Sequence, residues 1–297
     1  MEKRYAVLGA GTMGGGIARW LADQGRAVTV YDPDPGALRL AEANFAGMRP
    51  AMWTEDAGTA VEEAEVVFEA VPEDLNVKRR LFESLVPYVK EGTVVASNTS
   101  TFPLGQLAAD LPYGHRMVVA HFFQPAHIVP LVEVVRGPET EETAVASMMG
   151  LLTELGKVPV LLKKDIPGFL VNRLQAAVLR EACYLLDSGA ADAAEIDQAM
   201  REGAGLRWAL QGPFEITDFG GIDVWEKVAE RLFPDLSAER NVPKTIARLR
   251  EAGNLGVKSG RGWYEYGDTE QAKRKLQLRD ARLSALAAWK RDNGSTN

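Results

Sequence analysis

The stretch that decides the fold is Tyr5-Ala6-Val7-Leu8-Gly9-Ala10-Gly11-Thr12-Met13-Gly14, close to the start of the 297-residue chain. Its first four residues are apolar and predict a short buried strand, and helical spacing follows through Leu21. A second apolar run, Ala27–Tyr31, ends at Asp32. This order of strand, glycine turn, helix, strand and acid is typical of the turn that binds a dinucleotide pyrophosphate at a helix N-terminus.

The glycine turn and Asp32 carry the cofactor prediction. Glycines allow the tight turn and let backbone N–H groups approach a phosphate, while the Asp32 carboxylate would accept hydrogen bonds from the adenosine ribose. Its charge disfavours a 2′-phosphate, so the sequence favours NAD over NADP. The alternative is a glycine-rich turn without a ligand. The turn residues that we expect to contact the cofactor are Gly9, Gly11, Thr12, Met13 and Gly14.

Strand and helix patterns alternate over the first half of the chain. Apolar runs that predict further strands cover residues 65–73, 93–97, 117–120, 131–135 and 158–162. Such alternation predicts parallel βαβ units, in an α/β Rossmann-type doubly wound sheet, and ligands bind such sheets at the carboxyl ends of the strands. Four polar residues follow predicted strand ends, where a polar cap or turn is the alternative interpretation of each: Asp32, Glu73, Ser100 and His121.

The alternation stops near Asp165. Residues 169–188, 192–202, 214–232, 242–252 and 269–291 have almost wholly helical patterns. We therefore predict a Rossmann domain that binds NAD over residues 1–165 and an all-helical domain over residues 166–297. The long apolar helix around Leu174 and Leu185 is expected to be core or a dimer interface.

Composition excludes several classes of protein. The formal charge is −7 and the pI about 5.2, so no basic face for nucleic acid is expected. The single cysteine and the three histidines, which show no metal-ligand spacing, argue against a disulfide framework or a metal site. The sequence shows no signal peptide and no apolar run of membrane-spanning length. We expect a cytoplasmic protein with a small-molecule substrate and no nucleic-acid or membrane partner.

His121 and Glu133 are the candidate catalytic pair. His121 ends one apolar run and Glu133 lies inside the next, where a carboxylate is costly unless it has a partner. An imidazole can take a proton from an alcohol, and a carboxylate on its other ring nitrogen would fix the tautomer. The alternative is a core histidine with Glu133 facing water on an edge strand. Beside a nicotinamide site, the pair suggests alcohol oxidation.

Seven motifs along the chain form a recognisable set: Gly9-x-Gly11-x-x-Gly14, Glu69-Ala-Val-Pro-Glu73, Ser97-Asn-Thr-Ser100, His121-Phe-Phe-Gln-Pro, Leu131-Val-Glu133-Val, Pro167-Gly-Phe-Leu-Val-Asn172-Arg173 and Gly260-Arg-Gly-Trp-Tyr-Glu-Tyr266. Together they resemble the L-3-hydroxyacyl-CoA dehydrogenase family, in the family's order and over nearly the whole chain. The resemblance implies a Rossmann domain followed by a helical dimerisation domain, with the substrate between them.

The resemblance also implies roles for single residues. It makes His121 the base and Glu133 its partner, and it places Ser100 and Asn172 in catalytic hydrogen bonding to the substrate. Asp32, Glu73 and Lys78 match the family's cofactor contacts, and we add Asn98 to them. For Asn172 the alternative is a helix-start residue, and for Lys78 it is an exposed helix lysine.

Three departures bear on the substrate. Gln124, our further substrate contact, stands where the family usually has Asn, and Trp263 replaces the usual Phe. Few residues separate Asp32 from the strand at residue 65, where the family typically has a helical arm that helps to hold CoA. This deletion argues against an acyl-CoA substrate and leaves the dehydrogenase chemistry untouched.

The segments around Gly205-Leu206-Arg207-Trp208 and Gly212-Pro213-Phe214 also resemble the free-acid branches of the family, L-gulonate 3-dehydrogenase (lambda-crystallin) and carnitine dehydrogenase. Arg207 could bind a substrate carboxylate in a planar two-point contact. The alternative is a structural arginine that satisfies carbonyls at a helix end.

The prediction is thus an NAD-dependent oxidoreductase that converts 3-hydroxybutyryl-CoA to acetoacetyl-CoA, as in fatty acid metabolism, and forms a homodimer through its helical domain. The first alternative is a dehydrogenase of a free 3-hydroxy acid. The second is an inactive NAD-binding protein of the crystallin type.

Overall fold

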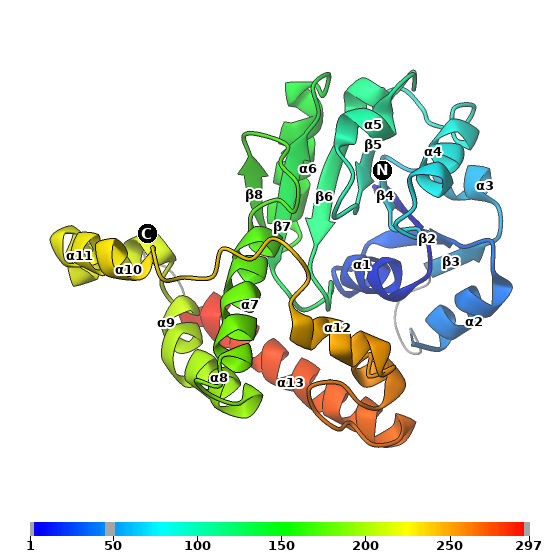
Figure 1. Cartoon of the computed structure of the whole chain (residues 1–297). Coiled ribbons are helices and arrows are strands. Elements are labelled where there is room, and N and C mark those ends of the chain that lie inside the picture. Colours follow the sequence, from blue (N-terminus) through cyan, green and yellow to red (C-terminus); the bar gives the residue numbers. More distant parts are fainter. Residues whose placement is uncertain (1–2, 45–50, 294–297) are drawn as a thin grey trace. The chain divides into compact units, whose positions relative to one another are not determined.

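The computed structural model describes residues 3–44 and 51–293 (Figure 1). It divides into two compact units, with the division between Val171 and Asn172 and with Leu283–Ala287 grouped with the first unit. The functional division at residue 165 stays a prediction. Among the described helices, none is both long enough and apolar enough to cross a bilayer. A cytoplasmic location likewise stays a prediction.

The first unit is built on an eight-stranded sheet in the order β3-β2-β1-β4-β5-β6-β7-β8. All neighbouring strands are parallel except β6 and β7, which are antiparallel. The strands are β1 (Arg4–Leu8), β2 (Ala27–Tyr31), β3 (Ala51–Thr54), β4 (Val66–Glu69), β5 (Val94–Ser97), β6 (Met117–Phe122), β7 (Leu131–Arg136) and β8 (Val158–Leu162). The chain leaves β1 toward β2 and later returns to β4 on the other side of β1. The carboxyl ends of β1 and β4 therefore form the switch point at which such sheets bind ligands.

Helices cover both faces of this sheet. One core cluster joins apolar side chains of α1 (Thr12–Asp23), α2 (Pro35–Asn44) and α6 (Glu142–Glu154) to alternate strand residues such as Tyr5 and Val7. The second cluster joins α3 (Ala57–Val61), α4 (Leu75–Ser84) and α5 (Leu104–Ala108) to the intervening residues such as Ala6 and Leu8. Almost all residues of the central strands β1, β4, β5 and β6 are thus buried on both sides, which explains their near-continuous apolar runs in the sequence.

The second unit is helical. Its elements are most of α7 (Val171–Asp187), α8 (Ala193–Ala199), the π-helical turn η2 (Met200–Gly205), α9 (Leu206–Trp208), α10 (Pro213–Gly220), α11 (Ile222–Leu232), α12 (Lys244–Glu251), the short η3 (Val257–Ser259) and most of α13 (Thr269–Asn293). The glycine-rich aromatic segment after α12 is fixed by the Tyr264 hydroxyl, which donates to the Asp197 carboxylate at 2.7 Å.

The predicted fold class is confirmed, and the differences lie in short or interrupted elements. The sequence patterns did not predict β3, α3 or α5, which have four or five residues each. One helix predicted over residues 214–232 is divided into α10 and α11, because Gly221 has a φ of 89° that breaks the helical path. The sequence pattern also predicts a helix from about residue 37 to residue 47, and the end of that helix falls in residues 45–50, outside the described residues.

Gly14 offers a test of how tightly the first turn is packed. A Cβ atom at this position would overlap the carbonyl oxygen of Gly9, so we expect Gly14→Ala to lower the free energy of unfolding by about 1–3 kcal/mol or more. Thermal and chemical denaturation measure the change. Gly11→Ala is the matched control, because a Cβ there meets no atom within 4 Å and should leave the unfolding temperature unchanged. Wild-type stability of Gly14→Ala would contradict this packing.

Candidate active site

The glycine turn after β1 is shaped for close approach. Gly9 has a φ of 105°, and its N–H donates to the Tyr31 carbonyl of β2 at 2.7 Å. A Cβ on Gly9 would come within 2.7 Å of the Ala70 carbonyl oxygen after β4, so only glycine fits between the two loops. Gly11, by contrast, faces open space at the N-terminus of α1. That space and the free N–H groups of the first turn fit a pyrophosphate.

Asp32 is fixed beside this turn. Its Oδ2 accepts a hydrogen bond from the Ala10 N–H at 2.8 Å, and its Oδ1 accepts from the Asp34 N–H at 2.9 Å. The carboxylate thus holds the glycine turn in place through Ala10, and its remaining lone pairs can accept a hydrogen bond from a ribose hydroxyl. Thr12 is exposed and Met13 is partly buried against the core beside α1. These placements fit a dinucleotide with an unphosphorylated ribose, such as NAD.

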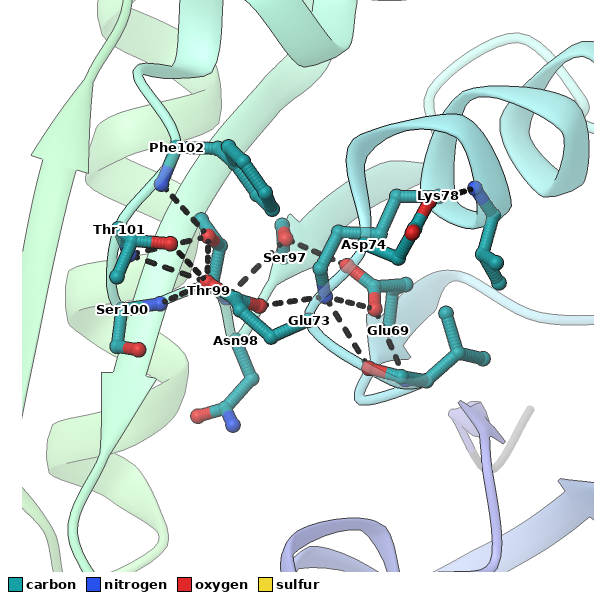
Figure 2. Close-up of polar contacts among 12 residues, drawn as sticks. Glu69, Glu73, Asp74, Lys78, Ser97, Asn98, Thr99, Ser100, Thr101 and Phe102 are labelled. Atoms are coloured by element: carbon teal, nitrogen blue, oxygen red, sulfur yellow. Dashed lines mark hydrogen bonds and ion pairs between the residues drawn. The ribbon is translucent and has the colours of Figure 1, made fainter.

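Lys78 and Glu73 belong to a polar network at the ends of β4 and β5 (Figure 2). The alternative that Lys78 is an exposed helix lysine is wrong, because its side chain is only 1% exposed and its ammonium lies 3.2 Å from the Glu73 carboxylate. Burial raises the pKa of Glu73, but hydrogen bonds from the turn after β5 outweigh this effect and leave the pKa below its ordinary value. Glu73 is therefore an anion at neutral pH.

The turn after β5 carries Asn98 and Ser100. The Asn98 side-chain oxygen accepts from the Phe122 N–H at 2.9 Å, which ties this turn to the end of β6 and leaves the amide nitrogen as the donor that Asn98 could offer to a ligand. The N–H of Ser100 donates to Glu73 at 2.9 Å, and the residue is half-buried. Its hydroxyl is thus carried on a turn whose backbone is fixed.

His121 and Glu133 form a buried pair. They are direct cross-strand neighbours on β6 and β7, and Nδ1 of His121 lies 2.8 Å from Oε2 of Glu133. Glu133 is fully buried on an interior strand between β6 and β8, so the alternative that it faces water on an edge strand is wrong. Its Oε1 accepts from the N–H groups of Leu170 and Val171, both at 2.9 Å, at the start of α7.

This geometry fixes the tautomer of His121. Burial raises the pKa of Glu133, but hydrogen bonds from His121 and from the start of α7 outweigh it, so the pKa lies below its ordinary value of 4.5. Because an ionised carboxylate can only accept, Nδ1 of His121 must carry the proton, and Nε2 of the neutral ring holds the lone pair. A general base of this kind takes up a proton on Nε2.

Two aromatic rings enclose the imidazole. The centroid of Phe123 lies 4.7 Å from that of His121 and the centroid of Phe169 lies 5.4 Å from it. Phe169 has a φ of 50°, which is uncommon for a residue other than glycine and carries strain. The strained backbone directs a buried ring onto His121 and at the same time turns the chain so that the next N–H groups reach Glu133.

Three further predicted site residues lie on other segments of the chain. Gln124 is exposed at the start of the loop after β6, and Asn172 is the second residue of α7. Arg207 is exposed on α9, and within the described residues its guanidinium makes no hydrogen bond or ion pair. The alternative role for Arg207, satisfying helix-end carbonyls, therefore has no support in this structure.

Sequence reasoning quoted Glu69 only as the start of a motif and gave it no role, and it did not single out Lys157. Glu69 at the end of β4 is fully buried in the network around Lys78. Lys157 donates to the carbonyls of Ala126 and Val129, at 2.6 and 2.7 Å, and so fixes the loop after His121. Burial lowers the pKa of Lys157 to about 8. A glutamate inside an apolar strand was an available signal for Glu69, whereas nothing in the sequence around Lys157 indicates its burial.

Comparison with known families gives matches over both units. Residues 4–52 and 46–166 match the family model for the 3-hydroxyacyl-CoA dehydrogenase NAD binding domain, and residues 168–266 match that for the 3-hydroxyacyl-CoA dehydrogenase C-terminal domain. Together these matches span most of the chain and occur in the expected order.

Individual relatives differ in the substrate that their names specify. The chain is 35% identical to 5-formyl-3-hydroxy-2-methylpyridine 4-carboxylate 5-dehydrogenase of Mesorhizobium japonicum, over 95% of this chain and 96% of the relative. A crystal structure of an enzyme of that name, described as an NAD+ dependent dismutase, superposes with a TM-score of 0.91 at 34% identity, over 96% of this chain and 97% of that one. A probable 3-hydroxybutyryl-CoA dehydrogenase of Bacillus subtilis is 34% identical over 89% of this chain and 97% of the relative.

The depressed pKa of Glu133 predicts an acid-sensitive contribution to stability. A carboxyl with a lowered folded-state pKa stabilises the fold above its ordinary value of 4.5, and this contribution is lost as the pH falls through the folded-state pKa. We expect Glu133→Gln to cost about 1.5–3 kcal/mol at neutral pH and progressively less in acid. Urea denaturation over a pH series measures this, with the exposed Glu139→Gln as control. If the loss of unfolding free energy in Glu133→Gln does not change with pH, the lowered pKa of Glu133 is contradicted.

Proposed function

The chain belongs to the 3-hydroxyacyl-CoA dehydrogenase family, with that family's NAD-binding domain in its first unit, and we propose that it oxidises the CH–OH group of a small carboxylate substrate with NAD. His121 is the proposed general base and Glu133 is its proposed partner. The observation that carries the proposal is the buried Nδ1–Oε2 contact of 2.8 Å, in which the carboxylate is ionised and the other ring nitrogen is left to accept a proton.

The chain's own residues would handle the proton. NAD, when bound, supplies the acceptor for the hydride that leaves the carbinol carbon. Nε2 of His121 takes the hydroxyl proton, and Glu133 compensates the positive charge that then develops on the ring. Phe123 and Phe169 keep water from the imidazole, which strengthens the ion pair. Ser100 and Asn172 are the proposed donors to the substrate oxygen.

A substrate without CoA is supported by the short connection between α2 and β3. Only residues 45–50 lie between these elements, too few for the helical arm that the family typically uses to hold CoA. The relative from Mesorhizobium, whose name specifies a pyridine carboxylate with a formyl group, matches nearly the whole chain. A hydrated aldehyde presents the same H–C–O–H unit as a secondary alcohol, so one base can serve either. Arg207 is the proposed contact for the carboxylate.

The second candidate is 3-hydroxybutyryl-CoA, converted to acetoacetyl-CoA in fatty acid metabolism. The relative from Bacillus subtilis supports it, because the name of that protein specifies this substrate and the match covers 97% of its length. The same His121–Glu133 chemistry would apply, with the CoA moiety held by residues other than the missing arm.

A panel of substrates separates the two candidates. L-Carnitine, L-gulonate, 3-hydroxybutyrate and 5-formyl-3-hydroxy-2-methylpyridine 4-carboxylate are compared with 3-hydroxybutyryl-CoA, each with NAD and with NADP. We expect NAD to be preferred over NADP. One of the free acids should have a kcat/KM at least about tenfold higher than the thioester, because a single well-placed contact between a charged residue and the substrate carboxylate is worth about that factor. Turnover of the thioester alone would favour the second candidate, and no turnover of any compound would refute both.

Assembly is a further proposal. Several large apolar side chains on α10 and α11 are exposed in the single chain, including Phe214 at 82%, Phe219 at 80% and Ile222 at 60%. Apolar exposure on this scale favours a homodimer through the helical unit. Light scattering coupled to size-exclusion chromatography should then give twice the chain mass of 32.4 kDa, and a monomeric mass at micromolar concentration would contradict this.

Replacement of His121 by asparagine tests the proposed base. Asparagine can still bond to Glu133 but cannot take up a proton, so kcat should fall by about 10²–10⁴ while the affinity for NADH stays within a factor of about two. Steady-state kinetics and fluorescence titration of NADH measure the two quantities. His115→Asn is the control, because His115 lies in the turn before β6 and its replacement should not change kcat. Wild-type turnover by His121→Asn would remove this residue from the mechanism.

A further inference from the structure

A second buried carboxylate lies in the first unit, away from the His121–Glu133 pair. Glu69 ends β4, and its side chain is completely buried. Its Oε1 accepts from the ammonium of Lys78 at 2.6 Å and from the Val71 N–H at 2.9 Å. Its Oε2 accepts from the hydroxyl of Ser97, at the end of β5, at 2.5 Å. Both oxygens of this carboxylate thus accept hydrogen bonds from the protein, two on Oε1 and one on Oε2 (Figure 2).

Lys78 connects Glu69 to Glu73. Its ammonium, 1% exposed, lies 2.6 Å from Glu69 and 3.2 Å from Glu73, and it also donates to the Val71 carbonyl at 3.3 Å. The three protons of the ammonium therefore have three fixed acceptors. One cation serves two carboxylates, and the buried Glu69 sets the position from which Lys78 reaches Glu73.

Glu73 in turn fixes the turn after β5. Its Oε1 accepts from the hydroxyls of Thr99 and Thr101, at 2.6 and 2.8 Å, and from the N–H groups of Ser100 and Thr101, at 2.9 and 3.1 Å. These four donors hold three successive residues on one oxygen, Thr99 through its hydroxyl and Ser100 and Thr101 through their backbone N–H groups. The orientation of the Ser100 hydroxyl therefore depends on where the Glu73 carboxylate lies.

We propose that Glu69 is a positioning residue, which sets Lys78 and through it Glu73, and so couples the cofactor side of the site to the turn that presents Ser100 to the substrate. This inference rests on the proposed function, because it takes Glu73 and Lys78 as cofactor contacts and Ser100 as a substrate contact. Glu69 itself touches neither ligand.

Stability alone does not account for a carboxylate at this position. Desolvating an ion pair offsets most of its Coulombic attraction, and apolar residues of similar volume often stabilise a fold equally well. Glu69 lies on the same face of the sheet as Leu8, Val67 and Val95, where an apolar side chain would pack with its neighbours. What an apolar residue could not do is hold the ammonium of Lys78 and the hydroxyl of Ser97 in fixed directions.

The test is Glu69→Gln, which keeps the shape and removes the charge that holds Lys78. We expect the Kd for NADH and the KM for the oxidisable substrate to rise together by about tenfold, as for the loss of one coupling in a polar network. The pH dependence of kcat should not move, because the His121–Glu133 pair is intact. A purely structural role would lower the unfolding temperature and leave Kd and KM unchanged at 25 °C, and that result would overturn the proposal.

Glu63→Gln is the matched control. Glu63 is an exposed carboxylate before β4 that pairs with Lys90 at 2.7 Å, at the opposite end of the same strand. Its replacement should change neither Kd nor KM. If Glu69→Gln does not fold, Ser97→Ala removes the donor to Oε2, together with the acceptor of the Thr99 N–H at 3.2 Å, and should shift Kd and KM in the same direction by a smaller factor. Unchanged constants in a folded Ser97→Ala protein would then overturn the proposal.

A double-mutant cycle identifies the route of the effect. Because Glu69 acts through Lys78, the double variant Glu69→Gln/Lys78→Met should bind NADH no more weakly than Lys78→Met alone. Additive losses would overturn the route through Lys78.

The experiments also separate this inference from the proposed function, because NADH titration needs no substrate. If the wild-type protein turns over no substrate and Glu69→Gln still has an altered Kd for NADH, the proposed function is refuted and the cofactor half of this inference is supported. If the wild-type protein turns over substrate and Glu69→Gln has the same Kd for NADH and the same KM as wild type, this inference alone is refuted.

Discussion

The structure of the site depends on one buried anion, the carboxylate of Glu133. It lies on an interior strand, where an isolated charge would be very costly, and it is stabilised by the imidazole of His121 on one oxygen and by two N–H groups at the start of α7 on the other. The same carboxylate therefore determines the tautomer of the base and the point at which α7 begins. The strained backbone at Phe169 is compatible with this arrangement because it delivers those N–H groups.

The sheet explains why the polar groups gather where they do. Residues of the central strands alternate between two core clusters, and Glu69, Ser97, His121 and Glu133 all lie on the face of the second cluster, toward the carboxyl ends of β4, β5 and β6. The antiparallel pairing of β6 with β7 places Glu133 directly opposite His121. One face of one sheet thus holds both a proton-accepting pair and a network that orders the neighbouring loops.

Two kinds of feature could be predicted from the sequence: elements with a regular apolar period, and charged residues whose burial costs free energy unless they have a partner. The glycine turn, the parallel strands and the partnered Glu133 follow from periodicity and from the cost of a carboxylate in an apolar strand. Short elements such as β3 and α3 were missed because four or five residues carry no measurable period. Glu69 was quoted only as the start of a motif and was given no role, although the argument made for Glu133 applies equally to it. The burial of Lys78 and Lys157 could not be predicted, because helix position and tertiary packing determine it and a lysine alone in sequence is usually exposed.

The central claim is that Glu133 is an anion that holds the proton of His121 on Nδ1 and leaves Nε2 to accept. Nitrogen-15 NMR of histidine-labelled protein tests it most directly, because the chain has three histidines and the two ring nitrogens give distinct shifts for each tautomer. At a pH where the ring is neutral, we predict a protonated Nδ1 and an unprotonated Nε2 for His121, a pattern that Glu133→Gln should weaken. A neutral His121 with its proton on Nε2 would contradict the account.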